Sequence, residues 1–167
     1  MPQFPLIVAF ILLFTQTAQV APTPQVFREG DYEITVPHGW MADRFGRDAT
    51  LKHITGASLI IINSQSTNNF DGFTTQAAER VANPLGFATI SEPRHFRDSS
   101  QEWYEYDIRG NRLTDHRKIL YRAVRTKTGL TQIIFESAED RFDILLPEAL
   151  SIASSLKSVP RKVRVRK

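Results

Sequence analysis

The chain has 167 residues, no cysteine, a formal net charge of +3 and a sequence pI near 9.4. Its length fits a single domain, and a content of 41% hydrophobic and 23% charged residues excludes a fully disordered chain and a polytopic membrane protein. The lack of cysteine excludes disulfide scaffolds, thiol catalysis and lipid attachment to a cysteine.

The start of the chain is uncharged. Residues 1–26 carry no charged side chain, and residues 5–14 form an unbroken apolar run that is followed by polar residues. Ten helical residues rise only about 15 Å, too little to cross a bilayer core. We therefore predict a signal peptide over residues 1–18, with cleavage after Ala18 or Ala21, and a short extended leader over residues 19–25. The alternative is a buried N-terminal strand or helix.

The predicted export sets the expected compartment. A cleaved signal peptide leaves a secreted or periplasmic protein with no transmembrane span.

The positive charge belongs to the end of the chain. The five tail residues Arg161, Lys162, Arg164, Arg166 and Lys167 leave 16 basic against 18 acidic residues in residues 26–160, a net charge of −2. A nucleic-acid-binding domain carries its basic stripe on the fold, so we expect no nucleic-acid partner. The basic tail, residues 161–167, is either a solubilising end or a weak contact to an anionic surface such as lipid headgroups.

The first half of the core alternates between strands and turns. Residues 31–36 alternate polar and apolar and predict a half-buried strand that Pro37-His38-Gly39-Trp40 ends with a turn. A weaker strand at 49–55 and an apolar strand at 59–62 follow. Residues 68–72 are interpreted as a loop, and a helix over 76–82 is predicted with Thr74 or Thr75 as its cap.

The second half predicts antiparallel strands and a long helix. Strands are expected near 88–91, 102–109, 118–125 and 130–138, with turns at Gly110-Asn111 and Thr128-Gly129. The helix has an apolar stripe from Phe142 to Leu156 and Asp140 as its cap; Pro147 lies in its first turn or kinks a longer helix.

These elements predict one α+β domain over residues 26–160. We expect an antiparallel β-sheet of about six strands, with the internal helix and the long C-terminal helix packed on it.

Two stretches resemble a known family. Residues 32–40 (YEITVPHGW) look like the opening strand and Pro-x-Gly-Trp turn of the PsbP-like superfamily, which includes bacterial DcrB-like exported proteins. Residues 129–138 (GLTQIIFESA), with the acidic residues, Phe142 and helix that follow, look like its last strand and closing helix. The resemblance implies helices packed on an antiparallel sheet, and a binding or assembly accessory rather than an enzyme. It carries over no functional residue.

The chain carries none of the common motifs for catalysis or metal binding. The four histidines lack zinc-ligand spacing, and there is no Gly-x-Ser-x-Gly elbow, Walker loop or dinucleotide glycine fingerprint. We predict no catalytic residue, metal ligand or cofactor; a metal site assembled from distant residues stays open.

The two tryptophans are the remaining candidates. Trp40, at its glycine turn, is predicted to fill the core. Trp103 shares a strand face with Glu105, Asp107 and Arg109, so it is either an exposed binding anchor or a residue beneath a helix. The carboxylates of Glu105 and Asp107 indicate a solvated face. Trp103, Arg109 and the five basic tail residues are the candidate binding residues.

The leading hypothesis is an exported, non-enzymatic accessory protein of the bacterial envelope that binds a protein or envelope partner. The alternatives are an exported hydrolase with an unrecognised active site, which requires a deep pocket with convergent polar groups, and a protein that associates with surfaces through its basic tail.

Overall fold

A computed structural model describes residues 23–65, 67–127 and 129–159. The predicted signal peptide and basic tail lie outside these residues, as does most of the leader. The strands are β1 (Gln25–Glu29), β2 (Tyr32–Val36), β3 (Trp40–Arg44), β4 (Ala49–His53), β5 (Ser58–Ser64), β6 (Gly86–Ile90), β7 (Arg94–Arg97), β8 (Gln101–Arg112), β9 (Asp115–Thr126), β10 (Leu130–Ala138) and β11 (Lys157–Ser158), and the helices are α1 (Phe70–Ala82) and α2 (Glu139–Ser155).

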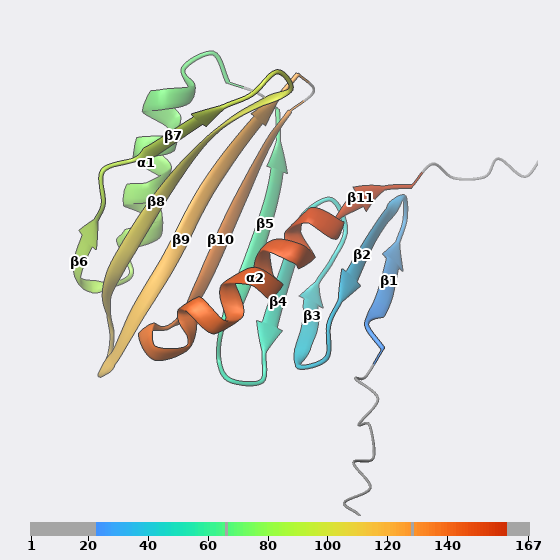
Figure 1. The fold of residues 1–167 in the computed structure, drawn as a ribbon, viewed down its shortest axis with the longest axis horizontal. Coiled ribbons are helices and arrows are strands. Elements are labelled where there is room, and N and C mark those ends of the chain that lie inside the picture. The colour runs from blue at the N-terminus through green and yellow to red at the C-terminus, as the bar shows by residue number, and fades with distance from the viewer. Residues whose placement is uncertain (1–22, 66, 128, 160–167) are drawn as a thin grey trace, which may run out of the picture.

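The strands form two antiparallel sheets (Figure 1). The large sheet has the order β3-β4-β5-β10-β9-β8, and β6 and β7 both pair with the outer edge of β8. The small sheet has the order β1-β2-β11. The α+β class is confirmed, whereas the expected six strands are too few: the described residues hold eleven. The strand β7 was missed because its residues are exposed, and β1 because only Phe27 of its residues packs against the core, so neither shows apolar alternation.

The two helices cover opposite faces of the large sheet. On β9, Leu120 packs into the cluster under α2, whereas the neighbouring Ile119 and Tyr121 pack into the cluster under α1. In Figure 1, α2 crosses in front of β10, β5 and β4, and α1 lies behind β8 and β9. Each helix therefore leaves part of its own face of the sheet uncovered.

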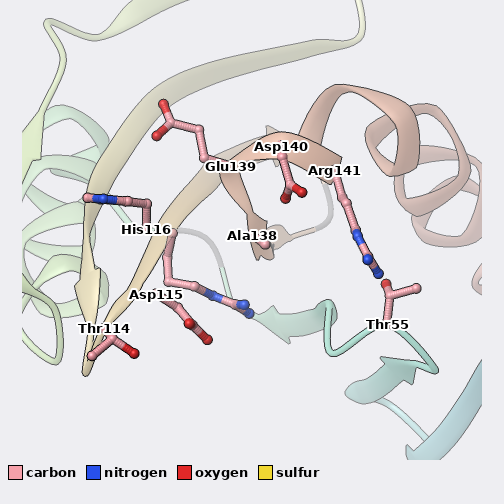
Figure 2. A pocket seen from close by; sticks show the side chains of 9 residues that line it. Thr55, Thr114, Asp115, His116, Ala138, Glu139, Asp140 and Arg141 are labelled. Atoms are coloured by element: carbon pink, nitrogen blue, oxygen red, sulfur yellow. The ribbon is translucent and has the colours of Figure 1, made fainter.

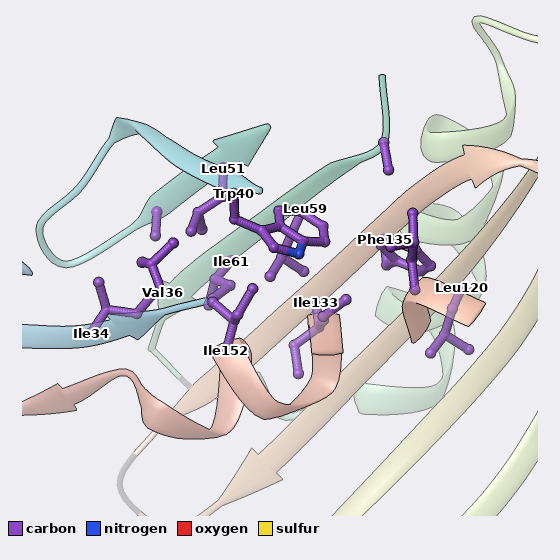
Figure 3. Close-up of a cluster of buried hydrophobic side chains, with 14 of the residues drawn as sticks. Ile34, Val36, Trp40, Leu51, Leu59, Ile61, Leu120, Ile133, Phe135 and Ile152 are labelled. Carbon is purple, nitrogen blue, oxygen red and sulfur yellow. The ribbon is translucent and has the colours of Figure 1, made fainter. Parts of the chain in front are cut away.

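The larger cluster joins both sheets to α2. Figure 3 shows Ile34 and Val36 of β2 beside Leu51, Leu59 and Ile61 of the large sheet, with Ile152 of α2 packed among them. Trp40 is 5% exposed in this cluster, which confirms its predicted place in the core.

Both helices begin earlier than predicted. Residues 70–72 were expected to be loop, but α1 starts at Phe70 because the side chain of Asn69 accepts a hydrogen bond from the Gly72 N–H at 3.2 Å. Helix α2 starts at Glu139, and no side chain caps it, so Asp140 lies in the first turn rather than at the cap. Pro147 is consequently inside a long helix, one of the two positions considered for it.

The turn predicted at Gly110-Asn111 is wrong. Both residues lie within β8, and the β8–β9 turn is Leu113-Thr114. Gly110 is needed for close packing instead, because a Cβ there would lie 2.8 Å from Cβ of Leu85. With the turn at Leu113-Thr114, each residue of β8 pairs with a residue of β9 several positions later than a turn at Gly110-Asn111 would allow. This register forms the site described next.

Candidate functional site

Trp103 lies on the part of the sheet that α2 leaves uncovered. It pairs with Phe96 of β7 and Val124 of β9, on the face where Leu120 meets α2. The rings of Trp103 and Phe96 stack with centroids 5.2 Å apart. Trp103 is thus beside charged residues and not beneath a helix; its use as a binding anchor stays a prediction. We call this area the open face, defined as Arg94, Phe96, Trp103, Glu105, Asp107, Arg122 and Val124.

An ion network occupies the centre of the open face. Arg94 donates to Asp107 Oδ2 at 2.6 Å and to Glu105 Oε2 at 3.2 Å, and Arg122 Nη2 lies 2.6 Å from Glu105 Oε1. Each carboxylate oxygen of Glu105 therefore has its own guanidinium partner, and Glu105 is 8% exposed rather than solvated as the sequence indicated. The hydrogen bond to Asp107 raises the pKa of Arg94, so this guanidinium keeps its charge.

This network is not optimised for stability. The Nε of Arg122 is buried and has no hydrogen-bond partner among the described residues. A buried donor without an acceptor costs about 1–3 kcal/mol.

Contacts on the α1 side hold the open face in place. The Tyr104 hydroxyl donates to Asp71 Oδ1 at 2.8 Å, and His95 stacks on the Tyr104 ring at 4.3 Å. Burial, with a smaller contribution from Asp71, raises the pKa of Tyr104 to about 12, so this hydroxyl keeps its proton. Behind Trp103, Glu102 pairs with Arg125 and His95. These contacts therefore fix β7 and β8, the two strands that carry most of the open face.

Arg109 is on the same side of β8 but at its other end. It is exposed and its Nη1 lies 3.6 Å from Glu139 of α2. Six residues of strand separate it from Trp103, about 20 Å. The structure does not bring these two predicted residues together, and the five basic tail residues lie outside the described part of the chain.

A second feature is a broad hollow at what we call the basal end, where β4, β8 and β10 finish and β5 and β9 begin. Its volume is about 740 Å³. Figure 2 shows Arg141 reaching toward Thr55 across it. Arg117 is tied down by Glu136 and the Gly56 carbonyl, both at 3.0 Å. The lining residues are Thr55, Thr114, Asp115, His116, Arg117, Ala138, Glu139, Asp140 and Arg141.

Within residues 23–65, 67–127 and 129–159, no group of three or more His, Asp or Glu side chains is placed to hold a metal ion. In the same residues, no helix has the length and apolar character needed to cross a membrane.

Sequence and structure comparisons give different results. No family model and no curated protein matches the chain. Among solved structures, cyanobacterial PsbP (CyanoP) from Synechocystis sp. PCC 6803 matches 85% of this chain and 95% of its own, with a TM-score of 0.53 and 19% identity. This chain has the PsbP-like fold. LpqN of Mycobacterium tuberculosis, described as involved in cell envelope biogenesis, matches 83% of this chain and 91% of its own, with a TM-score of 0.55 and 12% identity.

The PsbP-like fold confirms the resemblance drawn from residues 32–40 and 129–138. At these identities the comparison shows the fold alone.

Sequence reasoning missed three residues of the open face. Phe96 and Arg94 lie on the unpredicted β7, and Arg122 of β9 was not among the candidate binding residues. The register of β8 with β9 could have revealed Arg122, because the true two-residue turn places it opposite Glu105. Gly110-Asn111 was the stronger local turn signal, and it concealed that pairing.

Proposed function

We propose that this chain is an exported, non-enzymatic accessory protein of the bacterial envelope that binds a protein partner through the open face. The supporting observation is the stacked Phe96–Trp103 pair beside the network of Arg94, Glu105, Asp107 and Arg122, on a sheet face that neither helix covers. Aromatic and arginine side chains next to one another are typical of the energetic centres of protein interfaces.

The fold supports a role in the envelope. LpqN, whose fold is similar, is described as involved in cell envelope biogenesis. The uncharged, signal-like start of this chain supports export independently of that likeness.

The local geometry favours binding over catalysis. The open face presents side chains that already pair with one another, and Arg117 in the basal hollow has Glu136 and Gly56 as partners. Hydrolysis requires groups that converge on a substrate, and the hollow is open to solvent.

Affinity capture from an envelope extract of the source organism tests the proposal. The full chain is compared with Trp103→Ala and with the control Ile90→Ala, which removes an exposed apolar side chain on the α1 face. Wild type and the control should recover the same partner, and Trp103→Ala should reduce recovery at least tenfold. Equal recovery by all three, or no specific recovery by wild type, contradicts the proposal. Turnover of ester or glycoside substrates by the purified chain would instead support the hydrolase.

A further inference from the structure

The basal end carries the most exposed apolar side chains of the described residues. Phe87 is 93% exposed and Leu113 is 97% exposed, and Ile54, Ile144 and Met41 follow at 71%, 73% and 60%. The other exposed large apolar residues of the described chain, Val26, Phe96 and Ile90, reach 55%, 39% and 38%. Several large apolar side chains left in water at one end of a molecule indicate an interaction surface, whereas single ones do not.

The topology brings these five residues to one end. Alternating strand directions place the starts of β3 and β6 beside the ends of β4 and β8. Met41 and Phe87 are the second residues of β3 and β6, Ile54 follows β4, and Leu113 follows β8. Ile144 lies in the second turn of α2, which begins directly after β10. In Figure 1 the β8–β9 hairpin tip and the start of α2 form one lower corner of the molecule.

The two most exposed apolar side chains lie at residues with a strained backbone. Leu113 has φ +57° and Phe87 has φ +52°, in the left-handed region that glycine prefers. Leu113 is the first residue of a two-residue hairpin turn with φ positive there, where glycine is strongly favoured. A leucine that occupies a strained, fully exposed position lowers stability locally, which points to a use for its side chain.

The distance over which these residues are distributed indicates the shape of the surface that they contact. They extend across the seven neighbouring strands from β3 to β6, which at about 4.8 Å per strand is roughly 30 Å. They project from separate turns and elements rather than lining one groove. A broad apolar layer laid against this end can receive Leu113, Phe87 and Ile54 at once, whereas a single pocket cannot.

Exposed cations stand beside the apolar tips, together with the exposed carboxylate of Asp115. Arg112, which precedes Leu113, has a side chain 53% exposed, whereas its partner Glu136 is 12% exposed, so the outward group is the guanidinium. Arg109 and Lys52 are each 60% exposed at the same end. Long cationic side chains next to apolar tips reach the phosphates of lipid headgroups while the tips enter the acyl boundary.

We infer that the basal end is a bilayer-contacting surface, in which Leu113, Phe87 and Ile54 insert into the headgroup–acyl boundary of a phospholipid membrane. Arg109, Arg112 and Lys52 lie at the phosphate level. The carboxylates of Glu136, Glu139 and Asp43 pair with these cations, so the attraction is mainly apolar and should persist at high salt. This surface is separate from the open face, so the protein can bind lipid and a partner together.

The absence of cysteine allows a site-specific test on the full chain. An environment-sensitive fluorophore is attached to Thr114→Cys at the hairpin tip and, as a control, to Ser99→Cys in the exposed turn at the opposite end of β8. Mixed phosphatidylcholine–phosphatidylglycerol vesicles are added in ~0.5 M salt, which screens contacts of the basic tail. The tip probe should shift to the blue and the control should not. An unchanged tip probe, or equal shifts at both sites, overturns the inference.

Substitutions then distinguish the effect of these side chains on membrane binding from their effect on folding. The double change Phe87→Ser and Leu113→Ser should abolish the tip signal and weaken vesicle partitioning, by about tenfold for each side chain removed from lipid. Leu113→Gly relieves the backbone strain, so it should raise the thermal midpoint while still weakening partitioning. Trp103→Ala should leave partitioning unchanged, which distinguishes this surface from the proposed partner site. Partitioning that survives the double change in a folded protein contradicts the inference.

Discussion

The turn between β2 and β3 depends on one glycine and the ring beneath it. Gly39 has φ +90°, and a Cβ there would lie 2.7 Å from Nε2 of His53. His53 in turn packs against Trp40 with ring centroids 5.1 Å apart, and the Trp40 Nε1–H donates to Glu148 of α2 at 3.0 Å. The turn therefore positions the tryptophan that connects the sheet to the closing helix.

Gly39→Ala should lower the free energy of unfolding by about 2 kcal/mol or more, because left-handed backbone strain alone costs roughly 1–2 kcal/mol and the contact with His53 adds to it. Urea unfolding measures the change. Gly30→Ala is the control, since Gly30 has φ +59° with nothing within 4 Å of a Cβ and so reports strain alone. Adding His53→Ala to Gly39→Ala should recover the part of the stability loss that the contact with His53 causes. Equal losses of unfolding free energy in Gly30→Ala and Gly39→Ala contradict this account.

His53 should make stability fall in mild acid. Burial lowers its pKa below the ordinary value of 6.5. Below about pH 6.5 the unfolded chain therefore binds a proton at His53 more readily than the folded chain does. The free energy of unfolding is highest above this pH and declines as the pH falls below it. Urea unfolding of wild type and His53→Gln at several pH values between 8 and 5 measures the difference. The free energy of wild type should decrease more steeply than that of the variant; parallel curves refute the prediction.

At the level of elements, α2 combines a well-packed apolar side with a local sequence that is unfavourable for a helix. Phe142, Leu145, Ala149 and Ile152 are buried on one side, which secures the helix by packing. Its N-terminus lacks a side-chain cap and its interior contains Pro147, both unfavourable for an isolated helix. Tertiary packing therefore stabilises a helix that its local sequence would shorten.

Pro147→Ala should raise the free energy of unfolding by about 1–3 kcal/mol, because it restores a backbone hydrogen bond to the carbonyl of Asp143 and the proline ring is exposed. Thermal and urea unfolding measure the gain. Ser151→Ala, an exposed change on the same helix, is the control and should stay within about 0.5 kcal/mol of wild type. A loss of stability on removing the proline would show that its fixed backbone suits this position.

At the scale of the molecule, two helices on opposite faces leave two separate surfaces. The open face carries paired charges beside Trp103, and the basal end carries exposed apolar tips. The open face exists because α2 does not extend over its whole sheet face, whereas the basal end is formed by strand ends and turns. The charge of residues 26–160 is −2, so the basic tail supplies the positive net charge of the chain.

Ending the chain at Pro160 should change the formal net charge from +3 to −2 by removing five basic residues. The shortened chain should bind anionic vesicles more weakly at low salt, since each basic residue near such a surface contributes about 1 kcal/mol. Flotation assays at low and ~0.5 M salt measure the loss, and the two chains should converge at the higher salt. Equal binding at low salt dismisses a role for the tail, and a matching thermal midpoint verifies the fold.

Local patterns were enough to predict much of this PsbP-like fold. Side-chain alternation predicted β2 and the long strands, the glycine turn predicted a buried Trp40, and the apolar stripe predicted α2, because each pattern expresses burial within one element. The position of Trp103 among charges also followed from alternation along β8. The start of α1 was missed because its cap, Asn69, lay in a polar stretch that also suits a loop.

The partners of Trp103 and the basal surface were decided only by the tertiary structure. Glu105 meets Arg122 and Arg94 through the register of β8 with two neighbours, and a turn at Leu113-Thr114 sets one of these registers. Five apolar residues far apart in sequence share one end because strand directions alternate across the sheet. Alternation depends on adjacent residues and is visible in the sequence. Register and shared ends depend on contacts between distant strands, which one-dimensional spacing does not specify.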